Sequence, residues 1–172
     1  SRATNTVVSA SAICSTVMCV QNLAGVVESR YSLSAAISAR RSSCNGLSTE
    51  IVTATATGER HRRTYGEWAD RTRRLGGVLD RLGISADGRV ATFAWNTARH
   101  LELYFAAPCT GRVLHTLNLR LFPEQVTYIV NHAEDEVIFV DKTVAGLLWP
   151  LLSGFTTVRH IVVMDDGKGD VP

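Results

Sequence analysis

Four short segments dominated by apolar residues alternate with segments of helical character along the second half of the chain. They cover residues 90–95, 113–117, 136–141 and 158–164. They lack the polar alternation of a strand with one wet face, so each is predicted to be a strand buried on both faces. Parallel strands need a crossover between them, usually a helix. The pattern therefore predicts an α/β fold: an open, largely parallel layered sheet with helices on both faces.

The stretch from Arg89 to Asn118 is the fullest example of this pattern. Residues 90–95 are expected to form the first strand, and Thr97 can cap the helix that follows. The apolar and aromatic residues of the helix fall at helical spacing, and Pro108 with Gly111 is expected to end it. Residues 113–117 are expected to form a second buried strand. The whole stretch is therefore predicted to be one βαβ unit.

A β-hairpin is predicted to precede the sheet. Residues 51–56 are rich in β-branched residues, residues 57–59 supply a turn, and residues 60–65 return. Thr64 and Glu67 then match a capping box, which predicts that a helix begins there, and Gly83 suits the position just after its end.

The other helices and the first third of the chain complete the prediction. Pro123 is expected to begin a helix, and residues 144–151 are expected to form an apolar helix that Pro150 kinks or shortens. Residues 1–46 do not have the same character and are expected to be a poorly ordered arm or an edge element, with a weak helix at 31–44. Residues 47–172 are expected to be the α/β unit.

Composition excludes several classes of protein. The chain has 172 residues, a formal net charge of +2 and 20% charged residues, so it lacks the basic field of a nucleic-acid-binding protein. The sequence contains no run of 18 apolar residues, so no transmembrane segment is expected. The four cysteines form no CxxC pair, which favours reduced thiols and a cytoplasmic location. Peripheral association with a membrane is the alternative to a purely cytoplasmic location.

The turns after the strands contain few signs of chemistry. Neither a G-x-G-x-x-G turn, nor a Walker loop, nor a G-x-S-x-G elbow occurs in the sequence, and the five histidines lack metal-ligand spacing. No catalytic, cofactor-binding or metal residue is therefore assigned. His115 is interpreted as a buried histidine bonded to backbone. Asn96, His115 and Asn118 are the polar residues nearest strand ends, and they are the candidates for lining a substrate cleft.

Four segments in unbroken order carry a family resemblance. Residues 64–84, 88–118, 119–141 and 158–166 resemble the amino-terminal region of AMP-forming medium- and long-chain fatty-acyl-CoA synthetases, members of the adenylate-forming superfamily. The resemblance implies a partial amino-terminal domain of such a synthetase. It also implies ATP, Mg²⁺ and CoA as cofactors and a fatty acid as substrate. The reaction would pass through an acyl-adenylate, which CoA then converts to acyl-CoA and AMP.

The resemblance implies that the reactive groups lie elsewhere. The family's phosphate-binding loop and its catalytic lid would be expected after Pro172, so no functional residue of theirs has a counterpart in this sequence. The chain is therefore expected to be an amino-terminal fragment of a fatty-acid–CoA ligase, inactive alone, that associates with the missing carboxy-terminal segment. The alternative is a non-catalytic interaction module, which would form a homodimer.

Two positions depart from the family pattern. Arg112 stands where relatives have a small apolar residue, next to a predicted buried strand, and Leu119 stands where they have proline. A charge at position 112 is expected to be costly unless the guanidinium reaches solvent or a carboxylate.

Overall fold

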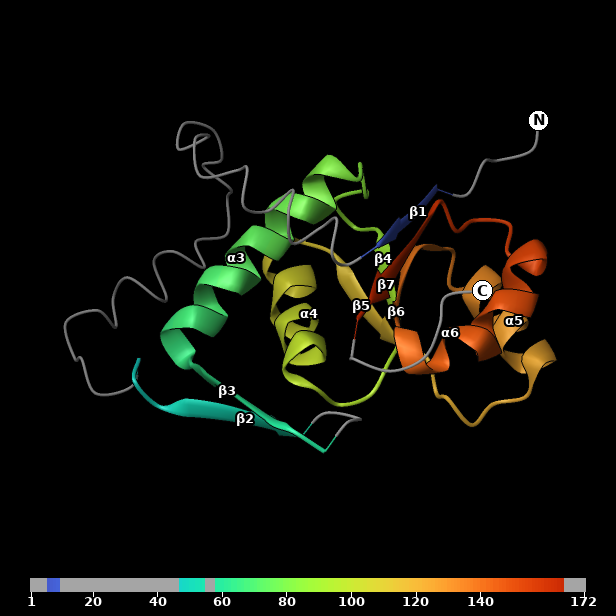
Figure 1. The fold of residues 1–172 in the computed structure, drawn as a ribbon. Helices are drawn as coiled ribbons and strands as arrows, with labels where there is room; N and C mark the ends of the chain where they lie inside the picture. Colours follow the sequence, from blue (N-terminus) through green and yellow to red (C-terminus); the bar gives the residue numbers. More distant parts are fainter. Residues whose placement is uncertain (1–5, 10–46, 55–57, 166–172) are drawn as a thin grey trace.

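A computed structural model describes residues 6–9, 47–54 and 58–165 of the chain (Figure 1). Five strands form one sheet in the order β1-β7-β6-β4-β5, and every neighbouring pair is parallel. The predicted open parallel sheet is confirmed. The strands are β1 (Thr6–Ser9), β4 (Arg89–Phe93), β5 (Val113–Thr116), β6 (Asp135–Asp141) and β7 (His160–Met164).

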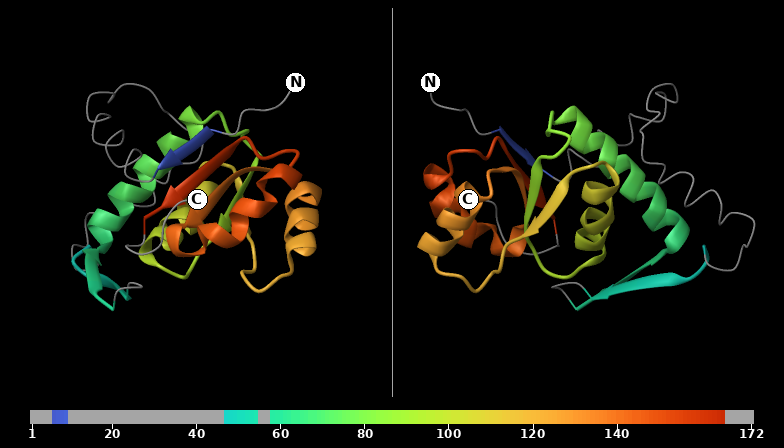
Figure 2. Two further views of the ribbon diagram at one scale, coloured as in Figure 1. Left: turned by 45° about the vertical axis from the view of Figure 1, so that its right-hand side comes forward. Right: turned by 180° about the vertical axis from the view of Figure 1, so that it is seen from behind.

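Helices cover both faces of this sheet, as predicted. The helices α3 (Tyr65–Arg81) and α4 (Ala98–Cys109) pack on one face. The helices α5 (Pro123–His132) and α6 (Lys142–Leu148) pack on the other, together with the 3₁₀ helix η2 (Trp149–Gly154). Both views in Figure 2 show the sheet between these two layers.

The core is divided by the sheet because successive side chains of a strand point to opposite faces. Val90 of β4 packs with Leu79 and Leu103 on the side of α3 and α4. Its neighbour Ala91 packs on the other side, in the cluster that contains Val130 and Leu148. Full burial of one such large aliphatic side chain stabilises the fold by about 1.5–3 kcal/mol. The continuous apolar character of the strands is thus explained by two covered faces.

The hairpin lies outside this sheet. Strands β2 (Glu50–Ala54) and β3 (Arg60–Thr64) are antiparallel and form a sheet of their own. The predicted capping box connects β3 to α3: Thr64 Oγ1 accepts from the Glu67 amide, and the Thr64 amide donates to Glu67 Oε2 at 2.9 Å. Gly83 follows the helix with φ 67°, a conformation that favours glycine.

Some predictions of burial are wrong, and two of them concern β5 and Leu147. Strand β5 was expected to be buried, but it is an edge strand, and its residue Val113 is 52% exposed. Leu147 was expected on the apolar face of its helix and is 62% exposed. The apolar residues of a segment do not show which of its sides another element of the fold will cover.

Two prolines lie near the ends of helices. Pro108 lies inside the last turn of α4, which ends at Cys109, between Pro108 and Gly111 as predicted. Pro150 shortens the predicted helix as expected: α6 ends at Leu148, and η2 continues the chain.

The first strand of the βαβ unit is shorter than predicted. Trp95 was placed in this strand, but β4 ends at Phe93, so Trp95 belongs to the following loop.

Arg112 is buried, and two of its three guanidinium nitrogens, Nε and Nη2, have hydrogen-bond partners, whereas Nη1 has none among the described residues. Its side chain is 5% exposed, and Nη2 lies 2.8 Å from Asp80 Oδ1 and donates to the Ile84 carbonyl oxygen, also at 2.8 Å. The guanidinium therefore meets the condition set from the sequence, by reaching a carboxylate. It ties the start of β5 to the end of α3.

Part of the predicted arm cannot be compared with the structure. Residues 6–9 form β1 at one edge of the sheet, next to β7. The predicted helix at 31–44 and three of the four cysteines lie outside the described residues. Within the described residues, none of the helices has the length and apolar character needed to span a bilayer.

Candidate functional site

The crossovers of the sheet diverge between β4 and β6, which are neighbours. The chain leaves β4 through α4 toward one edge, and it leaves β6 through α6 toward the other edge, on the opposite face. In open α/β sheets, ligands bind outside the carboxyl ends of the strands at such a topological switch point. The loop after β4 and the start of α6 therefore form the candidate site.

Hydrogen bonds join the two sides of this switch point. The backbone amide of Trp95 donates to Asp141 Oδ2 at 2.7 Å, and the indole Nε1 of Trp95 donates to Thr143 Oγ1 at 3.0 Å. Asp141 is fully buried, whereas Trp95 is 51% exposed. The indole is thus held in one orientation while half of its surface faces outward.

His100 of α4 also bonds the loop after β4. Its Nδ1 lies 3.2 Å from the Trp95 carbonyl oxygen, and its Nε2 lies 2.9 Å from Thr92 Oγ1. Since a carbonyl only accepts, Nδ1 carries the proton and Nε2 accepts from the threonine hydroxyl. Burial lowers the pKa of His100, and the bond to the Trp95 carbonyl opposes this in part. The imidazole is therefore a neutral support for the loop.

The two asparagines predicted to line a cleft follow the carboxyl ends of adjacent strands. Asn96 follows β4 and Asn118 follows β5, and both are exposed. Asn118 Oδ1 accepts from the Arg120 amide at 2.9 Å, so this asparagine shapes its own turn. The structure thus places both amides at the same edge of the sheet.

His115 lies apart from these asparagines. Its Nδ1 is 2.9 Å from both carboxylate oxygens of Asp135, which begins β6. Its partner is a carboxylate and not the backbone group predicted from the sequence. The bond to Asp135 raises the pKa of His115, and burial raises the pKa of Asp135. The imidazole is directed toward the amino ends of the strands, away from the switch point.

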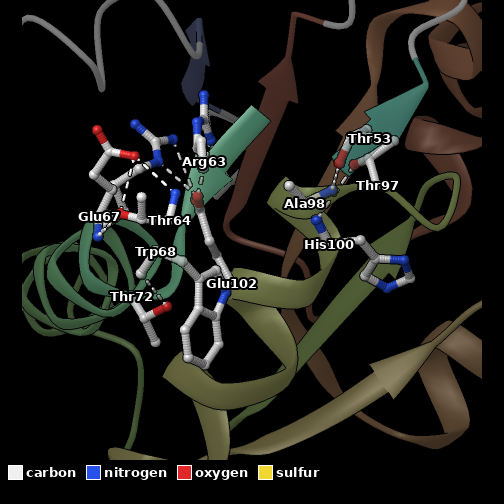
Figure 3. A network of polar contacts seen from close by, with 11 residues as sticks. Thr53, Arg63, Thr64, Glu67, Trp68, Thr72, Thr97, Ala98, His100 and Glu102 are labelled. Carbon is white, nitrogen blue, oxygen red and sulfur yellow. Dashed lines mark hydrogen bonds and ion pairs between the residues drawn. The ribbon is translucent and has the colours of Figure 1, made fainter. Parts of the chain in front are cut away.

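A second polar cluster connects the hairpin to the two helices behind the site (Figure 3). Glu102 of α4 is 4% exposed and binds Arg71 of α3, with Nε at 2.6 Å, and Arg63 of β3, with Nη1 at 3.1 Å. Nearby, Thr53 Oγ1 of β2 accepts from the Ala98 amide at the start of α4. The hairpin is therefore attached to the helix that begins directly after the site loop.

These residues were missed because each depends on a distant partner. Glu102 has the appearance of an ordinary helical glutamate, and its two arginines lie 39 and 31 residues earlier. For Asp141 a signal existed: it is the last residue of a buried strand in an α/β pattern, a place where functional carboxylates occur.

The groups described at the switch point are ones that can bind a ligand. They are an oriented indole, two amides and the Lys142 ammonium, which lies 3.9 Å from Asp165. Within the described ranges, no three His, Cys, Asp or Glu residues come together as a metal site would require. No reaction step is assigned to the described residues.

Comparison with known proteins places the chain in a family. Residues 45–170 match the family model of AMP-binding enzymes. The 3-methylmercaptopropionyl-CoA ligase of Ruegeria lacuscaerulensis is 47% identical over 122 residues, which is 71% of this chain and 23% of that protein. The long-chain-fatty-acid–CoA ligase of Thermus thermophilus is 49% identical over 117 residues, which is 68% of this chain and 22% of that protein.

Solved structures agree with the fold. An anthranilate–CoA ligase in complex with anthranoyl-AMP superposes with a TM-score of 0.63 at 18% identity, covering 75% of this chain and 24% of that one. The Mycobacterium tuberculosis fatty acyl-CoA synthetase superposes with a TM-score of 0.55 at 25% identity, covering 62% and 22%. The chain spans less than a quarter of the length of the two curated relatives named above. The resemblance seen in the sequence is confirmed, and the chain belongs to the family of AMP-binding enzymes.

Proposed function

We propose that this chain is the amino-terminal part of a fatty-acid–CoA ligase and that it supplies a scaffold, without the reactive groups, for the sites of the acid and of ATP. The observation that carries the proposal is the identity of 47% and 49%, over about 120 residues, to two ligases that join a carboxylic acid to CoA. A medium-chain-fatty-acid–CoA ligase from Ectopseudomonas oleovorans, 40% identical, supports the same substrate class.

In this proposal the switch point forms one wall of the substrate cleft. Asn96 and Asn118 lie at the carboxyl edge of the sheet, and Trp95, which precedes Asn96, is bonded to Asp141 and Thr143. ATP, Mg²⁺ and CoA would be bound chiefly by the remaining part of the ligase. The chain alone is then inactive and would associate with that part.

The inactivity is tested with the purified 172-residue protein. The assay is fatty-acid-dependent exchange of pyrophosphate into ATP, and the expected result is no turnover above the background without fatty acid. Clear turnover would refute the fragment interpretation, because the described residues would then carry chemistry that they are argued to lack.

The family role is tested by a chimera. Residues 47–166 replace the matching segment of the Thermus thermophilus ligase, and acyl-CoA formation is measured. The chimera is expected to be active. Asn96→Ala in the chimera is expected to lower kcat/KM by about tenfold, the loss of one hydrogen bond of about 1.4 kcal/mol. The control is Asn131→Ala, since that side chain bonds Gly154 and Thr156 away from the switch point. A folded chimera without activity would count against the proposal.

A non-catalytic interaction module is the second candidate. It is favoured by the open edge at β5 and by the exposed aromatic rings of Phe122 (71%) and Tyr128 (64%). Edge strands and exposed apolar side chains are common sites of self-association. Light scattering of the chain over a range of concentrations tests it, and a homodimer is the expected result. A monomer at high concentration would exclude this candidate.

A further inference from the structure

The edge strand β5 has few backbone connections to the rest of the fold. It pairs with β4 alone, over the four residues Val113–Thr116, and both of its terminal residues are exposed. Two further backbone bonds flank this pairing: the Val113 amide donates to the Gly88 carbonyl oxygen at 3.0 Å, and the Leu117 amide donates to the Thr92 carbonyl oxygen at 2.8 Å. A strand held by so few bonds is a candidate for local opening at a free energy well below that of global unfolding.

His115 supplies a side-chain connection that reaches past the neighbouring strand. It pairs with Ala91 of β4 in the sheet, but its imidazole contacts Asp135, which is level with Arg89 in the register of β4 and β6. The side chain of His115 is 28% exposed, and that of Asp135 is fully buried. Nδ1 of the imidazole lies 2.9 Å from each carboxylate oxygen.

The other charged groups around this pair are few. Arg89 of β4 acts on Asp135 through its positive charge, but its Nη1 also lies 3.6 Å from Glu134 and its side chain is 43% exposed. From α5, His132 stacks on Tyr128. The Thr157 hydroxyl bonds the main-chain oxygen of Asp135 and not its carboxylate. Among the residues that the structure describes, the hydrogen bonds recorded for this carboxylate come from His115.

We propose that His115 and Asp135 form a pH-sensitive clasp, which holds β5 on the sheet while the imidazole is protonated and releases it when the imidazole loses its proton. The mechanism is electrostatic. A protonated imidazole is the counter-charge of a buried carboxylate, and its deprotonation leaves that carboxylate with a neutral partner and the more distant Arg89. An uncompensated buried charge strongly favours any local opening that hydrates it.

The direction of the pH effect follows from proton linkage. Both groups bind their protons more tightly in the folded chain, since the bond to Asp135 raises the pKa of His115 and burial raises the pKa of Asp135. For groups with raised pKa values, the stabilisation is complete below the ordinary pKa and is lost as the pH rises through the folded pKa. The raised pKa of Asp135 acts at the more acidic pH where that carboxyl titrates, so the alkaline effect comes from His115. The clasp therefore opens as the pH rises above the ordinary histidine range.

The opening would affect the edge of the sheet at which the candidate site lies. Residues 117–122 connect β5 to α5 and include Asn118. Release of β5 therefore loosens that loop and leaves the central strands β4 and β6 paired. The clasp is a property of this chain and does not depend on whether the proposed ligase function is correct.

Hydrogen exchange of the 172-residue chain tests the clasp. The protection of residues 113–117 is measured between about pH 6 and about pH 9 and corrected for the intrinsic pH dependence of exchange. The corrected exchange rate is expected to rise with pH, by about tenfold for each unit by which the folded pKa of His115 exceeds the unfolded pKa. Protection of β4 and β6 is expected to change much less.

Two variants separate the clasp from general loosening. In His115→Gln the side chain can still bond Asp135 but cannot titrate, so the rise with pH is expected to disappear. In the control His132→Gln the rise is expected to persist. An equal rise in His115→Gln, or no rise in the wild-type chain, would overturn the proposal. Should His115→Gln fail to fold, an NMR titration of the His115 ring in the wild-type chain decides: a pKa at or below the ordinary value refutes the clasp.

Discussion

At the scale of single residues, Glu102 is a buried carboxylate that binds two arginines. It is 4% exposed and binds Arg63 and Arg71, whose side chains are 30% and 36% exposed. Glu102→Gln would leave two guanidinium groups without their counter-charge. Since both are partly hydrated, the expected loss of unfolding free energy is about 1–3 kcal/mol, below that of a fully buried pair.

Urea denaturation measures the effect of Glu102→Gln. The matched control is Glu50→Gln, because Glu50 binds Arg62 on the same hairpin with both side chains about half exposed. The control is expected to lose at most about 1 kcal/mol. Equal losses in the two variants would show that the Glu102 cluster is no more than a surface ion pair.

The contribution of Arg112 to the stability of the fold depends on its buried surroundings. Arg112→Ala removes the bonds to the Ile84 carbonyl oxygen and to Asp80, and it leaves that buried carbonyl with fewer donors. The expected loss is about 1–3 kcal/mol in urea denaturation. Asp80→Asn should cost less, because the side chain of Asp80 is 46% exposed. A neutral or stabilising Arg112→Ala would show that burying this charge costs more than its bonds return.

At the scale of elements, α3 depends on its cap. Thr64 and Glu67 satisfy two amides at the start of the helix, and Glu67 also suits the positive end of the helix dipole. Thr64→Val keeps the shape of the side chain and removes the hydroxyl, so it is expected to cost about 1 kcal/mol. Thermal denaturation checks it against Thr116→Val in exposed β5, which should change stability by less than about 0.5 kcal/mol.

At the scale of the whole molecule, two histidines act on stability in opposite directions. Burial lowers the pKa of His100, so its neutral form is favoured in the folded chain. A group with a depressed pKa contributes stability above its ordinary pKa that is lost as the pH falls toward the folded value. His115 acts on the alkaline side, so the chain is expected to be most stable near neutral pH.

The acid side of this profile is tested with His100→Asn. Stability of the wild-type chain is expected to fall between about pH 7 and about pH 5, with a contribution from His100 of at most about 1.4 kcal/mol for each pH unit. His100→Asn should be less stable at neutral pH and should show a shallower fall. His132→Gln should keep the wild-type slope. Identical slopes in His100→Asn and the wild-type chain would refute the role of His100.

The sequence by itself determined the local features of this protein. Caps such as Thr64 with Glu67, the helix start at Pro123 and the buried character of β4, β6 and β7 all depend on residues a few positions apart. They can therefore be predicted from the spacing of residues alone. The carboxyl-edge position of Asn96 and Asn118 followed from the same reasoning, since parallel strands end at one edge.

Only the tertiary structure decided which segments meet. Strand order made β5 an edge strand and exposed Val113, although the apolar residues of its segment predicted a buried strand. The same packing brought Trp95 to Asp141, Glu102 to Arg63 and His115 to Asp135, over separations of 20 to 46 residues. Such pairs leave no periodic trace in a sequence, because the free energy of each depends on burial and distance that arise only when the whole core has formed.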